Sequence, residues 1–232
     1  MSSSKTLKKL TLFDLDHTLL PLDSDYAWGT FTTVLGWTDA DEFARQNDVF
    51  YAHYQAGTLD IHDYVRFATR AVKNHGAIAS IAARDRFMRE IILPAIKPQA
   101  RALVDQHQQA GDEVLIITAT NEFVTRPIAD VFGVRELIAV ELEHEPPVGS
   151  TPGWITGEIR GTPSFREGKV SRIKAWLDQQ GLAADDVEIT FYTDSMNDLP
   201  LLEIANHPVA TNPDARLRSL AQSRGWRILD LF

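Results

Sequence analysis

Three short apolar runs, each followed by a polar residue, constrain the fold of this chain more than any other feature. They are LTLF before Asp14, EVLIIT ending at Thr118, and VEITFYT before Asp194. Their β-branched and aromatic composition predicts buried strands, and the helical periodicity between them predicts a parallel sheet. The expected fold class is therefore α/β, a Rossmann-like parallel sheet with helices on both faces.

Two helices of the expected core have start or stop signals in the sequence. Apolar residues recur at helical spacing after residue 100 and stop before Gly111, a residue suited to the end of a helix. A second periodic stretch follows Ser164 and Glu167, whose spacing predicts a capping box, and it ends near Gly181. Both helices are expected to lead into strands of the sheet.

The segment between the first two predicted strands differs from the rest of the chain. Residues 23–94 are rich in aromatic residues and helical spacing and contain no clear strand. We therefore expect an inserted α-helical cap subdomain there, and a core domain made of residues 1–22 and 95–232. The stretch HEPPVGSTPGWITGEIRGTPSF is broken by Pro and Gly and predicts an irregular connection with a short hairpin around 154–159.

Charge and composition limit the partners of the chain. Its 23 Lys and Arg against 32 Asp and Glu give a net charge of -9, which disfavours nucleic acid and acidic membrane surfaces. It has no cysteine, so disulfides and thiolate chemistry are excluded. The first apolar stretch is too short for a signal peptide and none is long enough to cross a bilayer. These features predict a cytoplasmic protein with a small-molecule partner and no integral membrane segment.

The polar residues that follow the three strands predict a site. In an open parallel sheet, ligands bind at the carboxyl ends of the strands, so Asp14, Thr118 and Asp194 should face one pocket. Asp16 and Asp198 add carboxylates beside them. Mutual repulsion would raise the pKa values of these carboxylates unless a cation is bound, and a small set of oxygen ligands suits Mg²⁺. Capping of the next element is the competing interpretation for each residue alone.

Lys169 is the candidate counter-charge for an anion in this pocket. It lies near the start of its predicted helix, where the helix dipole disfavours a cation, and a bound phosphate would relieve that conflict. A solvated surface lysine is the alternative. A P-loop is excluded for GTPSFREGKV, because the glycine spacing is too long and Val170 replaces the required Ser or Thr.

These residues resemble the four ordered motifs of the haloacid dehalogenase superfamily. The resemblance covers DLDHT at 14–18, the strand-end Thr118, Lys169, and DSMND at 194–198. A helical insertion between the first and second motifs resembles the phosphoserine phosphatase branch, whose members carry a small mobile cap. TATNEF and FREGKV are similar to a bacterial subgroup often assigned to histidinol-phosphate or phosphoserine phosphatases.

The resemblance implies a phosphatase with two aspartates in distinct roles. Asp14 would attack phosphorus and form an aspartyl phosphate, and Asp16 would protonate the leaving alkoxide and then deprotonate water. Thr118 would donate a hydrogen bond to a phosphoryl oxygen, and Lys169 would neutralise the nucleophile and the transferring group. Dehalogenases of the superfamily lack the second aspartate, so Asp16 argues against that reaction.

The resemblance also implies a Mg²⁺ cofactor and a surrounding set of binding residues. The metal would be held by Asp14, Asp194 and the Asp16 carbonyl, while Asp198 would support them by orienting Lys169. The remaining residues expected around the phosphoryl group are Thr18, Ala119, Asn121 and Asn197.

The cap residues predict the class of substrate. Asp23 and Asp25 could face an ammonium or imidazolium group, although capping of the following helix is an equal alternative. The arginine expected for a substrate carboxylate falls near Ala68, with Arg66 and Arg70 as neighbours and Arg66 as the candidate. This departure favours an amino alcohol phosphate, such as histidinol phosphate, over phosphoserine.

Two other functions remain open at the level of sequence. Capped relatives that dephosphorylate phosphatidylglycerophosphate make a lipid-head phosphatase the first alternative. A catalytically silent binding module of the same fold is the second, although every expected charged position is filled here. The motifs do not separate a hydrolase from a phosphotransferase, and they do not give the oligomeric state.

Overall fold

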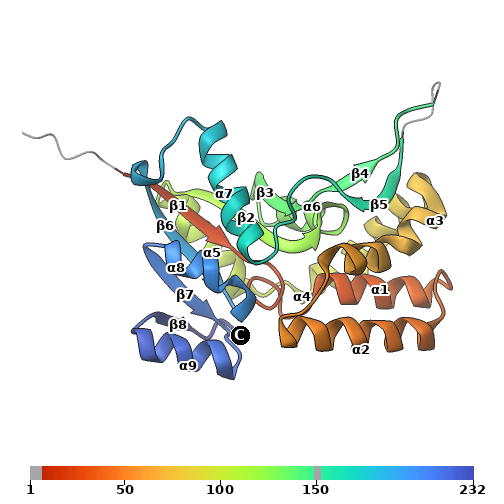
Figure 1. Ribbon diagram of the computed structural model, residues 1–232, viewed down its shortest axis with the longest axis horizontal. Coiled ribbons are helices and arrows are strands. Elements are labelled where there is room, and N and C mark those ends of the chain that lie inside the picture. Colours follow the sequence, from red (N-terminus) through yellow and green to blue (C-terminus); the bar gives the residue numbers. More distant parts are fainter. Residues whose placement is uncertain (1–6, 149–152) are drawn as a thin grey trace, which may run out of the picture.

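A computed structural model describes residues 7–148 and 153–232, and it contains one sheet of six parallel strands in the order β3-β2-β1-β6-β7-β8 (Figure 1). The strands of this sheet are β1 (Lys8–Phe13), β2 (Glu113–Asn121), β3 (Glu136–Val140), β6 (Val187–Thr193), β7 (His207–Thr211) and β8 (Arg227–Leu229). The start of the chain and part of its Pro- and Gly-containing connection lie outside the described residues.

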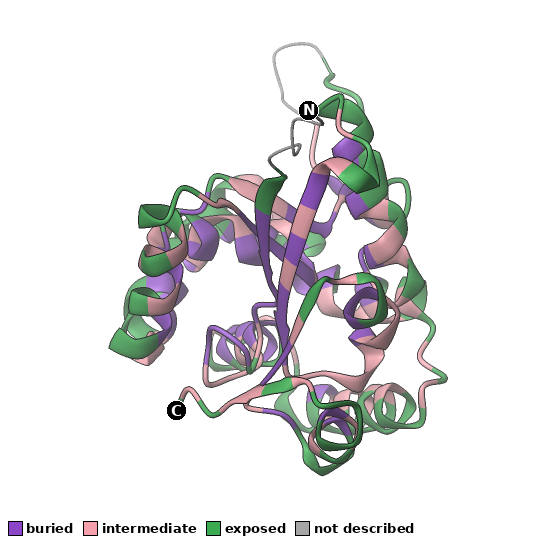
Figure 2. Cartoon of the chain, turned by 90° about the vertical axis from the view of Figure 1, so that its left-hand side faces the viewer, coloured by how far each residue is buried: buried purple, intermediate pink, exposed green. Residues whose placement is uncertain are grey.

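Helices cover both faces of the sheet, as the sequence predicts. Side chains of β1 alternate, so that Leu12 packs in one apolar cluster and Phe13 in the other. On the Phe13 face lie α5 (Pro98–Gln109) and α6 (Glu122–Val131). On the Leu12 face lie α7 (Glu167–Gln179), α8 (Leu199–Ile204) and α9 (Ala215–Arg224). The short helices η2 (Ala184–Asp186) and η3 (Met196–Asp198) flank β6. Figure 2 shows the buried strands between these exposed outer surfaces.

The strand order places the predicted site at a topological switch point. The chain adds β2 and β3 on one side of β1, and β6, β7 and β8 on the other. Crossovers from β1 therefore diverge beside the carboxyl ends of β1 and β6, where a crevice forms. Asp14 directly follows β1 and Asp194 directly follows β6, so both lie at this crevice.

The inserted segment is helical, as predicted. It consists of α1 (Ser24–Val34), α2 (Ala40–Ala56) and α3 (Ile61–Phe87), continued by the π-helix η1 (Met88–Ile92) and α4 (Leu93–Ala95). Gly76, with φ of +72°, kinks α3. Figure 1 shows α1, α2 and the first part of α3 side by side, beyond the carboxyl ends of the strands. The division into core and cap at 22/23 and 94/95 stays a prediction.

A hairpin from the core sequence packs against the cap. Strands β4 (Leu142–His144) and β5 (Ile155–Ile159) pair antiparallel, which includes the hairpin strand expected around 154–159. Trp154 donates from Nε1 to the carbonyl of Val72 in α3 at 3.0 Å. The cap is therefore stabilised by a segment distant in sequence.

The predicted capping box is wrong. Ser164 donates from its hydroxyl to the carbonyl of Thr118 at 2.6 Å, and Arg166 precedes α7 without a side-chain cap. A buried serine with a main-chain acceptor on β2 satisfies its hydroxyl there, so the local spacing to Glu167 is overridden by tertiary contact. The predicted ends of both core helices are confirmed, since Gly111 and Gly181 follow them with positive φ.

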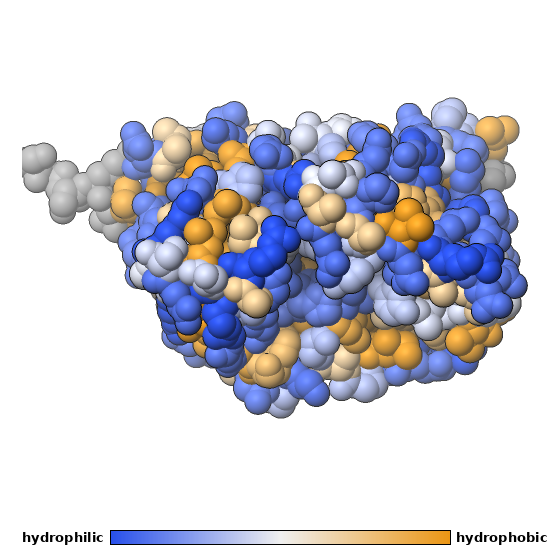
Figure 3. Space-filling view, turned by 60° about the horizontal axis from the view of Figure 1, so that its bottom comes forward, coloured by the Kyte–Doolittle hydropathy of each residue, from blue (hydrophilic) through white to orange (hydrophobic). Residues whose placement is uncertain are grey.

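None of the helices in the described part of the chain is long and apolar enough to cross a membrane. The face in Figure 3 is mostly hydrophilic, with hydrophobic residues scattered over it.

Candidate active site

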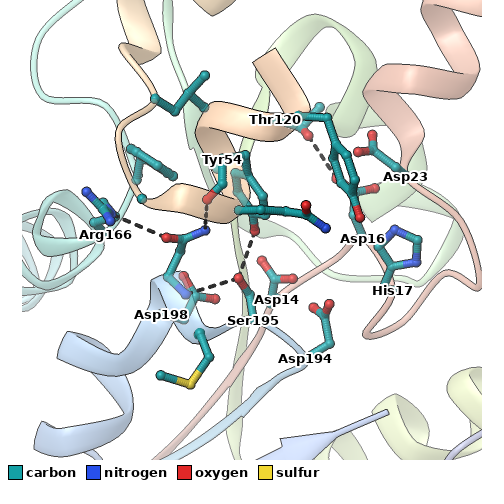
Figure 4. Close-up of a pocket in the computed structure, with 18 of the residues that line it drawn as sticks. Asp14, Asp16, His17, Asp23, Tyr54, Thr120, Arg166, Asp194, Ser195 and Asp198 are labelled. Atoms are coloured by element: carbon teal, nitrogen blue, oxygen red, sulfur yellow. Dashed lines mark hydrogen bonds between the residues drawn. The ribbon is translucent and has the colours of Figure 1, made fainter. Parts of the chain in front are cut away.

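A cavity of about 1200 Å³ lies between the carboxyl ends of the strands and the cap. Core side chains form one wall, and α1, α2 and α3 form the other. The core contributes Asp14, Asp16, Thr118, Ala119, Lys169, Asp194, Asn197 and Asp198, among others. Figure 4 shows several of these acidic side chains converging from different segments of the chain. The strand-end residues therefore share one cavity.

Lys169 forms the centre of the charged cluster and is 2% exposed. Its Nζ donates to Asp14 Oδ1 at 2.8 Å and to Asp198 Oδ2 at 2.6 Å. Burial alone would lower the pKa of this ammonium, but Asp14 and Asp198 raise it overall. The solvated-lysine alternative is wrong, because Lys169 lies in the third position of α7 and points into the core.

Asp14 and Asp194 carry more negative charge than Lys169 balances. Burial raises the pKa of Asp14 to about 7, with Lys169 opposing the rise and Asp198 and Asp16 adding to it. Burial, Asp14 and Asp198 raise the pKa of Asp194 well above its usual range. Further positive charge nearby would favour the ionised form of both carboxylates.

Thr18 connects the two acidic strand ends, at Asp14 and Asp194. Its hydroxyl donates to Asp194 Oδ1 at 3.1 Å and lies 3.4 Å from Asp14 Oδ2, while the main-chain N–H of Asp194 donates to it at 3.0 Å. Thr18 is fully buried and does not line the cavity. Thr18 therefore orients the two aspartates. The prediction that it contacts the substrate directly is wrong.

Asp16 lines the cavity beside Asp14 and is held from two sides. Its Oδ1 accepts from the main-chain N–H of Ser24 at 2.8 Å, and its Oδ2 accepts from the hydroxyl of Thr120 at 2.8 Å (Figure 4). Burial and the nearby Asp23 raise its pKa to about 6, against these hydrogen bonds. The carboxylate is thus oriented by α1 and by the segment after Thr118.

The donor set fits a divalent cation with few protein ligands. Among residues 7–148 and 153–232, no three His, Cys, Asp or Glu side chains form a ready-made metal cage. Mg²⁺ needs fewer, because it commonly binds one or two carboxylates and keeps several waters. Asp14, Asp194 and the main-chain carbonyl of Asp16 provide hard oxygen donors only. The excess negative charge on this cluster agrees with such an ion.

Besides Thr18, three further predicted substrate residues do not line the cavity. Asp25 is buried behind it, where it accepts hydrogen bonds from Asn121 Nδ2 at 3.2 Å and from Tyr64. Asn121 also caps α6 through Val124. Arg66 is exposed and pairs with Asp63 and Glu158. In each case the polar group already has hydrogen-bond or ion-pair partners outside the cavity.

Asp23 and Asn197 do line the cavity. Asp23 also accepts from the main-chain N–H of Tyr26 at 2.9 Å, so capping of α1 and exposure to the cavity coexist. Asn197 accepts from Arg166 Nε through Oδ1 and donates from Nδ2 to the carbonyl of Tyr54.

The sequence did not predict four residues that orient or connect parts of the site. Thr120 holds Asp16, Tyr54 and Ser195 form a contact between the cap and the core, and Arg166 contacts Asn197 and lies against Gly57. Thr120 and Ser195 adjoin predicted motif residues, so their positions gave a signal. No sequence signal pointed to Tyr54, because helical spacing does not show which aromatic residues of a cap helix face the core.

The comparison with known proteins decides the family. The model of the haloacid dehalogenase-like hydrolase family matches residues 11–203. The chain belongs to this family. A histidinol-phosphatase of Neisseria meningitidis is 42% identical to this family member over 225 residues, which cover 97% of this chain and 99% of the relative. A phosphoserine phosphatase of Mycobacterium tuberculosis is 30% identical over 97% of this chain and 71% of its own.

Solved structures agree with the fold of this hydrolase. A Bordetella pertussis protein of unknown function has a TM-score of 0.90 and 46% identity, covering 98% of this chain and all of its own. A phosphoserine phosphatase with a phospho-aspartyl intermediate analogue has a TM-score of 0.64 at 16% identity, over 98% and 95% of the two chains. This second likeness concerns the fold alone. Family, relatives and site together make the protein a phosphatase, as predicted.

Proposed function

We propose that this phosphatase hydrolyses histidinol phosphate with Mg²⁺ as cofactor and an aspartyl phosphate on Asp14 as intermediate. The observation that supports this choice of substrate is the 42% identity to a histidinol-phosphatase along nearly the whole of both chains. The chemistry of the cavity supports the same substrate independently, because its cap side is acidic.

Asp14 is the proposed nucleophile. One of its carboxylate oxygens accepts a hydrogen bond from Lys169. This bond fixes the orientation of the carboxylate, which faces the cavity. An Asp14 oxygen forms a bond to phosphorus while the bond between phosphorus and the alcohol oxygen breaks. Lys169 offsets negative charge as it develops on the phosphoryl group, and the Thr118 hydroxyl is a further donor at the same strand end.

Asp16 is the proposed acid and base. It donates a proton to the departing alkoxide, and then accepts a proton from the water whose oxygen attacks phosphorus. The bond from phosphorus to Asp14 breaks in this second step, which releases inorganic phosphate and restores the carboxylate. Thr120 and Ser24 keep the Asp16 side chain oriented during both transfers.

Bound Mg²⁺ would supply positive charge to the phosphoryl oxygens and to the two aspartates. Asp14, Asp194 and the Asp16 carbonyl would hold it. Thr18 fixes the separation of the two carboxylates through its hydroxyl, and Asp198 holds Lys169.

Specificity is proposed to come from the acidic cap wall. Asp23 and Asp48 line the cavity from α1 and α2, and histidinol phosphate presents an ammonium and an imidazole to them. The cap arginines near Ala68 are engaged elsewhere, since Arg66 pairs with Asp63 and Glu158, and Arg70 pairs with Glu42. A substrate carboxylate therefore lacks its expected cap partner.

Phosphoserine is the second candidate, because a phosphoserine phosphatase is among the relatives at 30% identity. Two core arginines, Arg166 and Arg216, line the cavity and are the alternative carboxylate partners. Both already have acceptors, in Asn197 Oδ1 at 3.3 Å and the Gln55 carbonyl at 3.1 Å. No contact of the described residues favours a lipid head group.

The test compares kcat/KM for histidinol phosphate, phosphoserine and an aryl phosphate. Asp23→Asn is the main variant, because asparagine still caps a helix while the charge is removed. Asp41→Asn, an exposed position in the first turn of α2, makes the same charge change on the cap outside the cavity. We expect a loss of about tenfold for histidinol phosphate with Asp23→Asn alone and the aryl phosphate spared. Wild-type preference for phosphoserine would reject the proposal.

A further inference from the structure

The last turn of α2 contacts the loop that carries Asp194 and Asp198. Tyr54 is half-buried, and its hydroxyl lies 2.7 Å from Ser195 Oγ, in the residue after Asp194. Its main-chain carbonyl lies 3.5 Å from Asn197 Nδ2, in the residue before Asp198. Figure 4 shows both contacts crossing from the cap to the core. One cap residue therefore contacts the acidic loop at two points.

A continuous series of hydrogen bonds runs from this contact to the nucleophile. The main-chain N–H of Ser195 donates to Thr193 Oγ1 at 3.1 Å, and the Thr193 hydroxyl donates to Asp198 Oδ2 at 2.7 Å. Asp198 shares that oxygen with Lys169, which donates to Asp14. Ser195 Oγ also accepts from the main-chain N–H of Asn197 at 3.2 Å. The position of the Tyr54 hydroxyl is thus linked to the geometry of Asp198 and Asp14.

A second contact brings the end of α2 against the core. Arg166 donates from Nε to Asn197 Oδ1 at 3.3 Å, and its guanidinium lies against Gly57. A Cβ on Gly57 would lie 2.4 Å from Arg166 Nη2 and would displace the guanidinium, and the φ of +73° at this position favours glycine. Arg166 itself has φ of +53°, an unfavourable backbone conformation maintained by its surroundings.

We propose that Tyr54 is a positioning residue, which through Ser195 keeps the Asp194–Asp198 loop ordered when the cap lies on the core. The cap then does more than select the substrate, because its presence over the cavity also orders the carboxylates that act on the phosphoryl group. The ordering is a property of this chain and stands without the proposed substrate. Only its effect on rate rests on the proposed function.

Hydrogen–deuterium exchange of the protein as purified tests the ordering without any turnover. The variants are Tyr54→Phe and Ser195→Ala, which remove the contact from opposite sides. Ser195→Ala also removes the acceptor of the Asn197 N–H, so Tyr54→Phe is the decisive variant. Tyr51→Phe, one turn earlier on α2, is the matched control, because its exposed hydroxyl has no hydrogen bond among the residues described. We expect amides at 195–198 and at the end of α2 to exchange about three- to tenfold faster in both variants, and at the wild-type rate in the control.

Kinetics with an aryl phosphate provide the second readout. The losses in kcat/KM should be about three- to tenfold for each variant and should not add in the double variant, because one contact is removed twice. Wild-type exchange at 195–198 in Tyr54→Phe, or additive losses, would overturn the proposal. Faster exchange in the variants of a protein inactive on histidinol phosphate would reject that substrate and retain the positioning role.

Discussion

Two polar clusters of this protein differ in charge balance. The acidic cluster consists of Asp14, Lys169, Asp194 and Asp198, near the carboxyl ends of β1 and β6. The histidine cluster consists of Thr11, His107, Asp112 and Tyr192, beside α5. In the latter, His107 lies 2.6 Å from Asp112 Oδ2 through Nδ1 and 2.8 Å from the Tyr192 hydroxyl through Nε2. Thr11 donates to the same Asp112 oxygen at 3.1 Å.

The difference shows how a structural polar cluster is distinguished from a reactive one. In the histidine cluster one acid faces one base, and the hydroxyl groups of Thr11 and Tyr192 contact that pair. In the acidic cluster three acids accompany one ammonium, which contacts two of them, and the pKa values of Asp14 and Asp194 rise as a result of burial and repulsion. Proteins keep such an imbalance where a ligand or a reaction uses it. Variants in the two clusters should therefore have opposite effects on activity and stability.

The largest expected effect is that of Asp14→Asn. Removing the nucleophile should lower kcat by at least about a thousandfold, while the loss of one repelling charge should keep or raise the melting temperature. Phosphate release and thermal unfolding of the same preparation measure both. Near-normal turnover would favour direct attack by water over a covalent mechanism.

Removal of divalent metal should have the next largest effect. Excess chelator should reduce turnover by about a hundredfold or more, because Asp14 and Asp194 then repel the phosphate as well as each other. Mg²⁺ should restore activity, and Ca²⁺ should inhibit, since its larger and looser shell would disturb the attacking geometry. Unchanged turnover in chelator would contradict the assignment of the acidic cluster.

Asp16→Asn should slow turnover by roughly a hundredfold through the loss of proton transfer. An aryl phosphate with a good leaving group should be affected less in the first step, because its departure needs little protonation. Measuring both substrate types separates this role from a purely structural one. Equal losses for the two would argue for misplacement of Asp14 instead.

The buried Asp25 provides a test of how the free energy of unfolding depends on pH. Burial, Asp23 and Asp16 raise the pKa of Asp25 to about 8 from 3.8. The folded state therefore binds more protons between these values, and stability falls as pH rises through this window, by at most about 1.4 kcal/mol per unit for one group. Asp25→Asn, which imitates the protonated acid, should flatten this fall in urea unfolding between pH 5 and 8. An unchanged slope would show that Asp25 is not the titrating group.

The smallest expected effect is that of Tyr192→Phe in the histidine cluster. It removes one hydrogen bond to His107 and keeps the ring stacked on Phe13, so stability should fall by about 1 kcal/mol. The value of kcat/KM should stay within twofold or so of wild type, within the usual scatter for such remote changes. A large loss of activity would show that the two clusters are coupled across β1 and β6.

The sequence predicted the sheet and the positions of its acidic residues because strand ends converge by topology. Once three apolar runs are taken as parallel strands, Asp14, Thr118 and Asp194 must meet at one edge. Lys169 followed from the charge that this edge requires. These inferences need no knowledge of side-chain packing.

The cap residues could not be predicted in this way. Asp25 and Arg66 have suitable chemistry, but Asp25 is buried against Asn121 and Arg66 pairs with Glu158 from the distant hairpin. Tyr54 reaches Ser195 across 141 positions of sequence. Helical periodicity gives the buried face of a helix but not the partner that covers it, and that choice is made by tertiary packing.

Trapping the intermediate tests the central claim most directly. Wild-type protein mixed with histidinol phosphate and Mg²⁺ is quenched in acid within one turnover, digested, and analysed by mass spectrometry for phosphorylated peptides. The account predicts one modified aspartate, Asp14, and no phosphopeptide in Asp14→Asn. Phosphate release by the wild type without modification of Asp14, together with turnover by Asp14→Asn, would contradict it.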